Sequence, residues 1–432
     1  MIRLVLMSFY RLLCLALSFI LGKVVFSRSR KAGSVSEAIL TLEYPSSKSR
    51  LRIWFHAASV GELECISTLI FKAAEEGHEL ILTTLSESTH QALEDFRLAL
   101  VSKSARVIFI GYSPLEGAWF NTLSEIKPSI FITAKYEAWP DLWLSLAQLE
   151  IPLLIVSARM RRSFRIVRIF CRILLGRLPV LYFFTAQSQD DHSLIAAFPH
   201  AEVKCVGEPR WDRVSQRRNT GHAKAHELIH CIEGKMSRPW GILGSVWLDD
   251  LKVFGSALRL TEGSLLIVPH RIDSDSVRIM AEYLKSELGL NPILTSKRHE
   301  MIQKLQKNAG DSRARDCIIV NEMGFLSELY ASASWVFVGG GFTHGVHSTI
   351  EPAIYGVPIA CGPLGVEKFV ETLDLERSGQ LKVVKDSQAL REWLSEVVIT
   401  VNSPEYKARW LVESQRRLGA TQKIWDTLEK IK

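Results

Sequence analysis

The sequence has few cysteines and no paired pattern among them, which argues against several classes of protein. Its seven cysteines are odd in number, widely spaced and never arranged as CxxC. A disulfide framework or a structural zinc site is normally built from closely spaced pairs of such residues. The cysteines therefore indicate reduced thiols, as in a cytosolic compartment.

The chain also lacks internal repeats, low-complexity tracts, coiled-coil heptads and any surplus of acidic residues. Apolar residues make up 47% and charged residues 23% of its 432 residues, which is typical of a globular protein with two domains. The 53 basic residues outnumber the 46 acidic ones, for a net charge of +7. That balance favours anionic partners: phosphorylated ligands, acidic lipids or nucleic acid.

The most apolar stretch lies at the N-terminus. Residues 1–26 are almost wholly apolar and long enough to cross a bilayer. Because Arg11 lies inside this run, a tilted or interfacial helix is an alternative, and a cleaved signal peptide is a second one, disfavoured by the lack of a cleavage site. A basic cluster over residues 28–31 follows, so the positive-inside rule places the rest of the chain in the cytoplasm. The sequence predicts an N-terminal membrane anchor with a cytoplasmic body.

Short apolar runs alternate with helical patterns in two series. The first series has strand candidates at 51–57, 79–85, 106–112, 129–135, 152–158 and 182–188. The second has them at 240–246, 263–270, 290–296, 316–321, 334–340, 357–363 and 381–386. Such alternation predicts parallel sheets covered by helices.

We therefore expect an α/β protein with two Rossmann-like, doubly wound domains, over 35–214 and 239–400. A polar, strand-poor linker over 215–238 joins them, and 401–432 forms a C-terminal helix that we expect to cross back to the first domain. Ligands bind beyond the carboxyl ends of the strands in open α/β sheets, so the predicted site is the cleft between the domains.

The stretch HAASVGE, residues 56–62, ends a predicted strand in small residues and one glutamate. Glu62 has two interpretations. It is either a charge that stabilises the N-terminus of the following helix, or an acid/base group at a strand end. Periodicity alone favours the first.

Residues 335–363 combine a strand, a glycine triplet at 339–341 and a helix that carries Glu351. Glycines let backbone N–H groups approach a phosphate, and a helix N-terminus attracts the anion. A tight structural turn explains the triplet equally well. Glu351 fits a carboxylate that holds a ribose diol, or a charge that stabilises the helix dipole.

A basic amphipathic helix is predicted over 159–177, where arginines alternate with isoleucine, phenylalanine and leucine. Five of these arginines are the predicted contacts with an anionic membrane surface: Arg161, Arg162, Arg165, Arg168 and Arg172. Nucleic acid is the rival partner, and a basic helix that packs only on its own domain is a third interpretation. The apolar N-terminus favours the membrane, and no nucleic acid is expected.

Three histidines, His222, His226 and His230, have helical spacing that would suit zinc. Because there is no HExxH motif, we interpret them as part of a surface helix and expect no metal site.

Six motifs in order resemble the 3-deoxy-D-manno-octulosonic acid (Kdo) transferases. They are HAASVGE, EAWPDLW, SARMRRSF, AQSQDD, VGEPRWD, and VGGGFTHGVHSTIEPA with the later GVPIACGP. The resemblance implies the GT-B fold, CMP-Kdo as donor and a lipid A precursor (lipid IVA) as acceptor. It also implies inversion at the anomeric centre, no cofactor or metal, and a place on the cytoplasmic side of the inner membrane in lipopolysaccharide synthesis of a Gram-negative envelope.

The resemblance assigns roles residue by residue. Glu62 matches the catalytic base, which takes the proton of an acceptor hydroxyl. The acceptor side is implied to include Ser59, Gly61, Glu137 and Arg210. The donor side is implied to include Ser245, Arg271, Met323, Gly324, Gly339, Gly340, Gly341, His347, Ser348 and Glu351.

The chain departs from the family pattern at several of these motifs. Lys135 stands where the family usually has a glutamate, and Arg210 where it has a lysine. On the donor side Trp247 replaces a histidine, Phe325 a glutamate and Ser348 an asparagine. These departures keep two alternatives open: a GT-B transferase that uses another nucleotide-activated sugar, and a catalytically silent membrane-bound scaffold.

Overall fold

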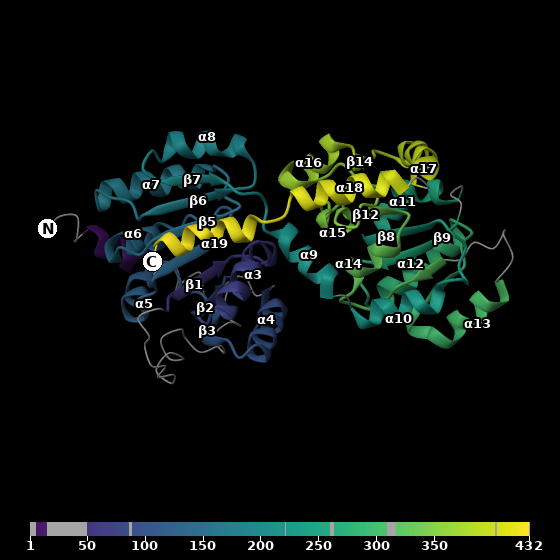
Figure 1. Ribbon diagram of the computed structural model, residues 1–432, viewed down its shortest axis with the longest axis horizontal. Helices are drawn as coiled ribbons and strands as arrows, with labels where there is room; N and C mark the ends of the chain where they lie inside the picture. The colour runs from purple at the N-terminus through teal and green to yellow at the C-terminus, as the bar shows by residue number, and fades with distance from the viewer. Residues whose placement is uncertain are drawn as a thin grey trace. The chain divides into compact units, whose positions relative to one another are not determined.

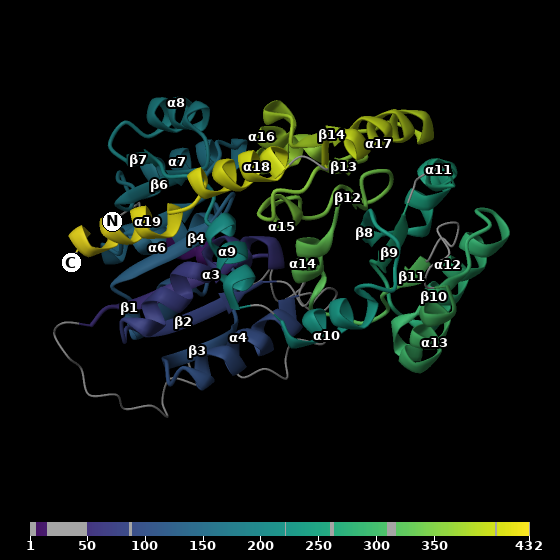
Figure 2. The same ribbon diagram turned by 45° about the vertical axis from the view of Figure 1, so that its right-hand side comes forward.

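The computed structural model describes residues 6–14, 50–85, 89–220, 222–259, 263–308, 317–401 and 404–431. They divide into two compact units, 1–213 with 419–432, and 214–418. Each unit is built on a seven-stranded parallel sheet with helices (Figures 1 and 2). The predicted α/β architecture of two doubly wound sheets is confirmed.

In the first unit the strand order is β3-β2-β1-β4-β5-β6-β7. The strands are β1 (Arg52–Ala57), β2 (Glu79–Thr84), β3 (Arg106–Tyr112), β4 (Ile130–Ala134), β5 (Leu153–Val156), β6 (Leu181–Thr185) and β7 (Glu202–Cys205). The order reverses at β1, which lies between β2 and β4. Loops that follow β1 and β4 therefore leave the sheet at its switch point, where open α/β sheets bind ligands.

Helices cover both faces of this first sheet. The helices are α3 (Val60–Glu75), α4 (His90–Ser102), α5 (Trp119–Ile126), α6 (Pro140–Leu149), α7 (Arg162–Leu174), α8 (Ser188–Ala197) and α19 (Ala420–Ile431), with α9 (Arg210–Thr220) leading into the second unit. One face buries α5 to α8 in a core that includes Trp143 and Phe164. The other face buries α3, α4 and α19, with Trp425 of α19 fully inside.

Within the predicted anchor, residues 6–14 form a helix, whereas 1–5 and 15–26 lie outside the described residues. Arg11 donates to Asp141 over 2.7 Å and also to Ser145 and Gln148, and its guanidinium lies over the Phe120 ring. The charge that is costly in a bilayer is thus paired on the first unit. Across the described ranges, no helix has both the length and the apolar character to span a membrane.

In the second unit the strand order is β10-β11-β9-β8-β12-β13-β14. The strands are β8 (Trp240–Val246), β9 (Ser264–Pro269), β10 (Pro292–Leu294), β11 (Cys317–Ile319), β12 (Trp335–Val338), β13 (Ile359–Cys361) and β14 (Leu381–Val383). Here β8 lies between β9 and β12. The loops that follow these three strands therefore lie together at the carboxyl ends of the strands.

The helices of the second unit complete the fold. They are α10 (Ala223–Ile232), α11 (Leu248–Leu258), α12 (Ser274–Ser286), α13 (Arg298–Asn308), α14 (Leu326–Leu329), α15 (Ile350–Ala353), α16 (Val370–Ser378), α17 (Ser387–Val401) and α18 (Pro404–Arg416), with short 3-10 turns at 295–297, 330–332 and 366–368. Side chains of α11, α12 and α17 share one core with the sheet. The segment 215–238, expected as a linker, contains the end of α9 and all of α10.

Candidate active site

Glu62 lies at the switch point of the first sheet and is buried, with 9% of its surface exposed. Its Oε2 accepts the backbone N–H of Ala58 over 2.8 Å, and its own N–H donates to the Ser59 hydroxyl that caps α3. This is a capping arrangement, so the helix-stabilising role exists. Because Oε2 is held by the amide, the orientation of the whole carboxylate is set as well.

A second buried carboxylate, Glu137, faces Glu62 from the loop after β4. Its side chain accepts the indole N–H of Trp139, and its Oε2 lies 3.6 Å from Nε2 of His56. The other ring nitrogen of His56, Nδ1, is 3.1 Å from the Thr83 hydroxyl. A polar chain thus runs from β2 through β1 to the Glu137 carboxylate.

These neighbours act on the pKa of Glu62 in opposite directions. Burial is the largest influence and raises that pKa, and the negative charge of Glu137 raises it further. The Ala58 amide, Lys135 and His56 oppose this by favouring the ionised form. The net result is a carboxylate that accepts a proton more readily than an exposed glutamate does, which suits a general base.

Arg210, another predicted acceptor residue, is linked to the surroundings of Glu62 through Glu208 and Lys135. Lys135 follows β4 directly, in the left-handed backbone region at φ 58°, where few residues other than glycine occur. Burial works to raise the pKa of Glu208, but the charges of Arg210 and Lys135 outweigh it and lower that pKa below its usual range. Arg210 donates its Nε to Glu208 over 3.1 Å, so Arg210 forms an ion pair within the first unit.

Gly61, another predicted acceptor residue, borders open space. A Cβ added there would meet no atom within 4 Å, and its φ is not in the left-handed region. Neither packing nor backbone conformation requires a glycine at this position. The residue before Glu62 is therefore exposed and borders open space.

In the second unit, the glycine triplet 339–341 packs tightly against its surroundings. A Cβ on Gly339 would lie 2.4 Å from the Ser245 carbonyl oxygen, and Gly340 has a φ of 87°. The Gly340 N–H donates to Asp250 over 2.7 Å. The close packing and the left-handed Gly340 fit the turn interpretation of the triplet, and the Gly340 N–H is already bonded to a carboxylate.

Four rings from the ends of three adjacent strands form what we call the ring cluster: Trp247, His270, His344 and His347. Trp247 stacks on His344 with centroids 3.9 Å apart and on His270 at 4.3 Å. His270 stacks on His347 at 4.5 Å, and Arg271 lies over the Trp247 ring at 5.4 Å. The sequence identified His347 and Arg271, but His270 and His344 were missed because their loops meet only in the folded sheet.

The other predicted donor residues lie around this edge. Ser245 is at the end of β8 with a φ of 52°, beside a register shift between Gly244 and Val246. Met323 and Gly324 follow β11, and Met323 is 74% exposed. Ser348 is exposed, and Glu351 is half-buried in α15.

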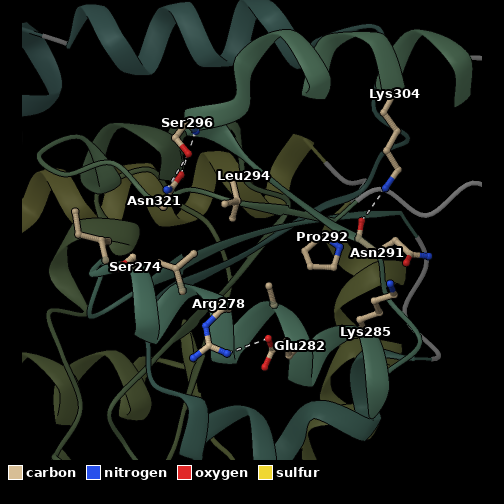
Figure 3. A pocket seen from close by; sticks show the side chains of 13 residues that line it. Ser274, Arg278, Glu282, Lys285, Asn291, Pro292, Leu294, Ser296, Lys304 and Asn321 are labelled. Carbon is tan, nitrogen blue, oxygen red and sulfur yellow. Dashed lines mark hydrogen bonds and ion pairs between the residues drawn. The ribbon is translucent and has the colours of Figure 1, made fainter.

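A separate pocket of about 610 Å³ lies along α12, between that helix and the edge strand β10 (Figure 3). Several of its polar side chains bond within its wall: Arg278 to Glu282, Lys304 to the Asn291 carbonyl, and Asn321 to the Ser296 amide. None of the predicted donor residues lines it. We therefore place the candidate donor site at the ring cluster instead.

The predicted membrane helix is α7, and its arginines divide into two groups. Arg168 donates to the Ala197 carbonyl and lies near the Phe198 ring, so it is engaged on the first unit. Arg161 lies over the Tyr136 ring. Arg162, Arg165 and Arg172 are exposed and flank an outward stripe of Ile166, Ile169 and Ile173.

Comparison with known proteins gives consistent results. Residues 30–213 match the family described as 3-Deoxy-D-manno-octulosonic-acid transferase (kdotransferase). The chain is 22% identical to the 3-deoxy-D-manno-octulosonic acid transferase of Aquifex aeolicus, over 83% of this chain and 91% of that protein. It is 23% identical to the Haemophilus influenzae protein of the same name, over 87% and 86%.

Solved structures match the fold across both units. A glycosyltransferase from Rickettsia africae has a TM-score of 0.55 at 13% identity, covering 88% of this chain and 98% of that one. The UDP-GlcNAc 2-epimerase from Neisseria meningitidis also has a TM-score of 0.55, at 12% identity, covering 88% and 100%.

The two doubly wound sheets have the GT-B fold. The match over 30–213 and the transferase relatives indicate a glycosyltransferase of that fold. Both the match over 30–213 and the relatives that span most of the chain carry the same description, Kdo transferase. The first unit matches the Kdo transferase family, and relatives named as Kdo transferases span most of the chain.

Proposed function

We propose that this enzyme transfers Kdo from CMP-Kdo to a hydroxyl of a lipid A precursor, by an inverting displacement in which Glu62 is the general base. The observation that carries the proposal is the Glu62 carboxylate, which is buried at the switch point and held by the Ala58 amide, one residue after the exposed Gly61. A sugar hydroxyl is a poor nucleophile, so a positioned base must take its proton during attack.

Each group of the first unit has a part in this proposal. Glu137 and burial raise the pKa of Glu62, so the carboxylate gains affinity for the proton it must remove. Lys135 and His56 keep it ionised before the acceptor arrives. Ser59 orients the helix start that carries Glu62, and Arg210 supplies positive charge for the phosphates or carboxylates of the substrates.

The donor would bind in the second unit. Arg271 and the histidines of the ring cluster provide cationic and aromatic contacts for a nucleotide phosphate, and Ser245 provides a hydroxyl at the same strand edge. The match of the whole fold to GT-B enzymes supports this placement at the strand ends. We propose that transfer needs no metal ion, which addition of a chelator to the assay tests directly.

We also propose that the enzyme acts at the cytoplasmic face of the inner membrane. The exposed isoleucines of α7 and the exposed Leu6, Phe9, Leu12 and Leu13 of helix 6–14 support this. The two helices are neighbours, since Tyr10 packs on Phe170 with ring centroids 5.0 Å apart. Apolar side chains flanked by arginines suit the interface of an anionic bilayer.

The activity is tested by incubating the full-length protein with a lipid A precursor and a CMP-Kdo-generating system, followed by mass spectrometry. We expect the acceptor mass to grow by one or more Kdo residues. Parallel reactions with UDP-sugars test the alternative donor. Turnover of a UDP-sugar without turnover of CMP-Kdo would overturn the donor assignment.

The base is tested by Glu62→Gln. This substitution keeps the shape and the acceptor oxygen for Ala58 but removes the basic carboxylate. We expect kcat to fall by about 10² to 10⁴ with the fold retained by circular dichroism. Glu64→Gln on the same helix, where Glu64 pairs with Arg213, is the matched control and should retain activity. Near-normal transfer by the folded Glu62→Gln protein would remove Glu62 as the base.

A further inference from the structure

In the ring cluster, three histidine rings and the Arg271 guanidinium surround the indole of Trp247 at the carboxyl ends of the strands. Its stacked geometry is compatible with neutral rings, because several adjacent positive charges would repel one another. The Trp247 indole Nε1 donates a hydrogen bond to Nε2 of His347 over 3.2 Å. Since an indole N–H can only donate, Nε2 of His347 must be unprotonated, and this ring is held neutral.

We propose that the ring cluster binds the donor phosphate together with a proton, taken up by His270 or His344, so that donor affinity rises as pH falls. This inference rests on the proposed function, because it takes the donor to be a cytidine phosphodiester. It assigns different tasks to the histidines: His347 stays neutral and is held by Trp247, and the two exposed rings are the proton acceptors.

Burial and the charges around the cluster disfavour protonation of its histidines before the ligand binds. Burial lowers the pKa of His270, and His344 and Arg271 lower it further. Burial, then His270 and His344, lowers the pKa of His347 to about 4. Without ligand, burial and the positive charge of Arg271 therefore oppose a second cation in the cluster.

Asp250 is the carboxylate that faces the cluster, at the start of α11. It accepts the N–H groups of Trp247 and Gly340, over 2.9 and 2.7 Å. Burial raises the pKa of Asp250, and those two hydrogen bonds oppose the rise by favouring the ionised carboxylate. A phosphate that reached the exposed rings would add negative charge beside them, which reverses the balance and favours imidazolium.

Titration calorimetry with the methyl ester of CMP tests the inference. This probe has one phosphodiester charge that does not change near neutral pH, so any proton taken up must go to the protein. Measurements in two buffers of different ionisation enthalpy report that proton directly. We expect net uptake near neutral pH and binding up to about tenfold tighter for each pH unit lowered. Cytidine, which has no phosphate, should show neither effect.

His270→Gln and His344→Gln, alone and combined, locate the proton. Both positions are exposed, so the folded state should tolerate glutamine. We expect the double variant to bind the ester without proton uptake, while His226→Gln on the exposed side of α10 keeps the full linkage. Trp247→Phe removes the hydrogen bond that holds His347 neutral and should increase the number of protons taken up.

Three outcomes contradict the inference, and they can be told apart. Ester binding without proton uptake in the unmodified enzyme would overturn the inference and leave the proposed donor standing. No ester binding at any pH would overturn both. Full proton uptake in the double variant would show that the proton goes elsewhere, and would also overturn the assignment.

Discussion

At the scale of single residues, Glu62 combines a helix-capping contact with the surroundings of the base that we propose. Its Oε2 accepts the Ala58 amide, as a helix-capping carboxylate does, and the same bond fixes the orientation of the carboxylate. The two interpretations of Glu62, a charge that stabilises the helix N-terminus and an acid/base group, therefore do not exclude each other. What distinguishes Glu62 from an ordinary capping charge is its burial and the nearby charge of Glu137.

Lys135 provides a test of how the base is tuned. Its positive charge lowers the pKa of Glu62, so Lys135→Met should raise that pKa. If Glu62 is the base that we propose, it works when ionised, so the acidic limb of the kcat/KM profile should move to higher pH, with a loss of about threefold or more near pH 6. Lys135→Arg should restore the profile.

The control for this experiment is Lys127→Met. Lys127 also has a left-handed backbone, at φ 50°, but it is exposed at the end of α5. It should leave the pH profile unchanged. An unshifted profile in Lys135→Met, with transfer intact, would exclude Lys135 from the tuning of Glu62.

Glu116 makes stability depend on pH. Burial, and then the charge of Asp141, raises the pKa of Glu116 to about 8. A carboxyl with a raised folded-state pKa contributes stability that is full below its unfolded pKa and is lost as pH rises through about 8. Glu116→Gln removes this loss, so its free energy of unfolding relative to wild type should rise between pH 5 and pH 8, by about 1 kcal/mol or more at the upper end. Melting curves across this pH range measure the change. A constant difference across that range would contradict the assignment.

At the scale of elements, α7 presents two different faces. Its inner side buries Phe164, Val167 and Cys171, while its outer side exposes three isoleucines. We expect Ile166→Glu combined with Ile173→Glu to weaken binding to anionic vesicles by at least about tenfold in a flotation assay, since each change puts a charge into the apolar stripe.

Ile279→Glu is the matched control, because Ile279 is an exposed isoleucine on α12 of the second unit. It should leave vesicle binding unchanged. Equal binding by the α7 double variant and the wild type would place the membrane contact elsewhere on the chain.

At the scale of the whole molecule, the chain returns to the first unit to complete its core. Helix α19 buries Ile424, Trp425 and Leu428 there, after a second unit that ends at Leu418. Asp212 caps this return, accepting the N–H groups of Gly419 and Thr421, both over 2.7 Å. The core of the first unit therefore depends on both ends of the sequence.

Asp212→Ala should destabilise the first unit by about 1 to 2 kcal/mol, because two amide N–H groups lose their acceptor. A lower melting transition in scanning calorimetry would measure it. Asp426→Ala, an exposed aspartate of α19 bonded to Gln422, should have almost no effect. Equal melting of both variants would show that the cap contributes little.

Periodicity predicted most of this architecture, since thirteen of the strands match an apolar run. The exception is β7, whose sequence EVKC is charged and partly exposed at the sheet edge. An edge strand has only one neighbour and need not be apolar, so no hydrophobic signal marked it. The 1–26 anchor was predicted from the same kind of signal, and most of it lies outside the described residues.

The local sequence was sufficient for the elements and for the motifs around Glu62, because strands buried on both faces and helix caps leave short-range patterns. Which residues lie beside those motifs in space depends on the order of the strands in each sheet. Neighbouring β1 and β4 bring Glu137 and Lys135 to Glu62, and neighbouring β8, β9 and β12 bring Trp247 to three histidines. Pairing between distant strands is a non-local property, and so are the burial and the mutual charges that tune these groups.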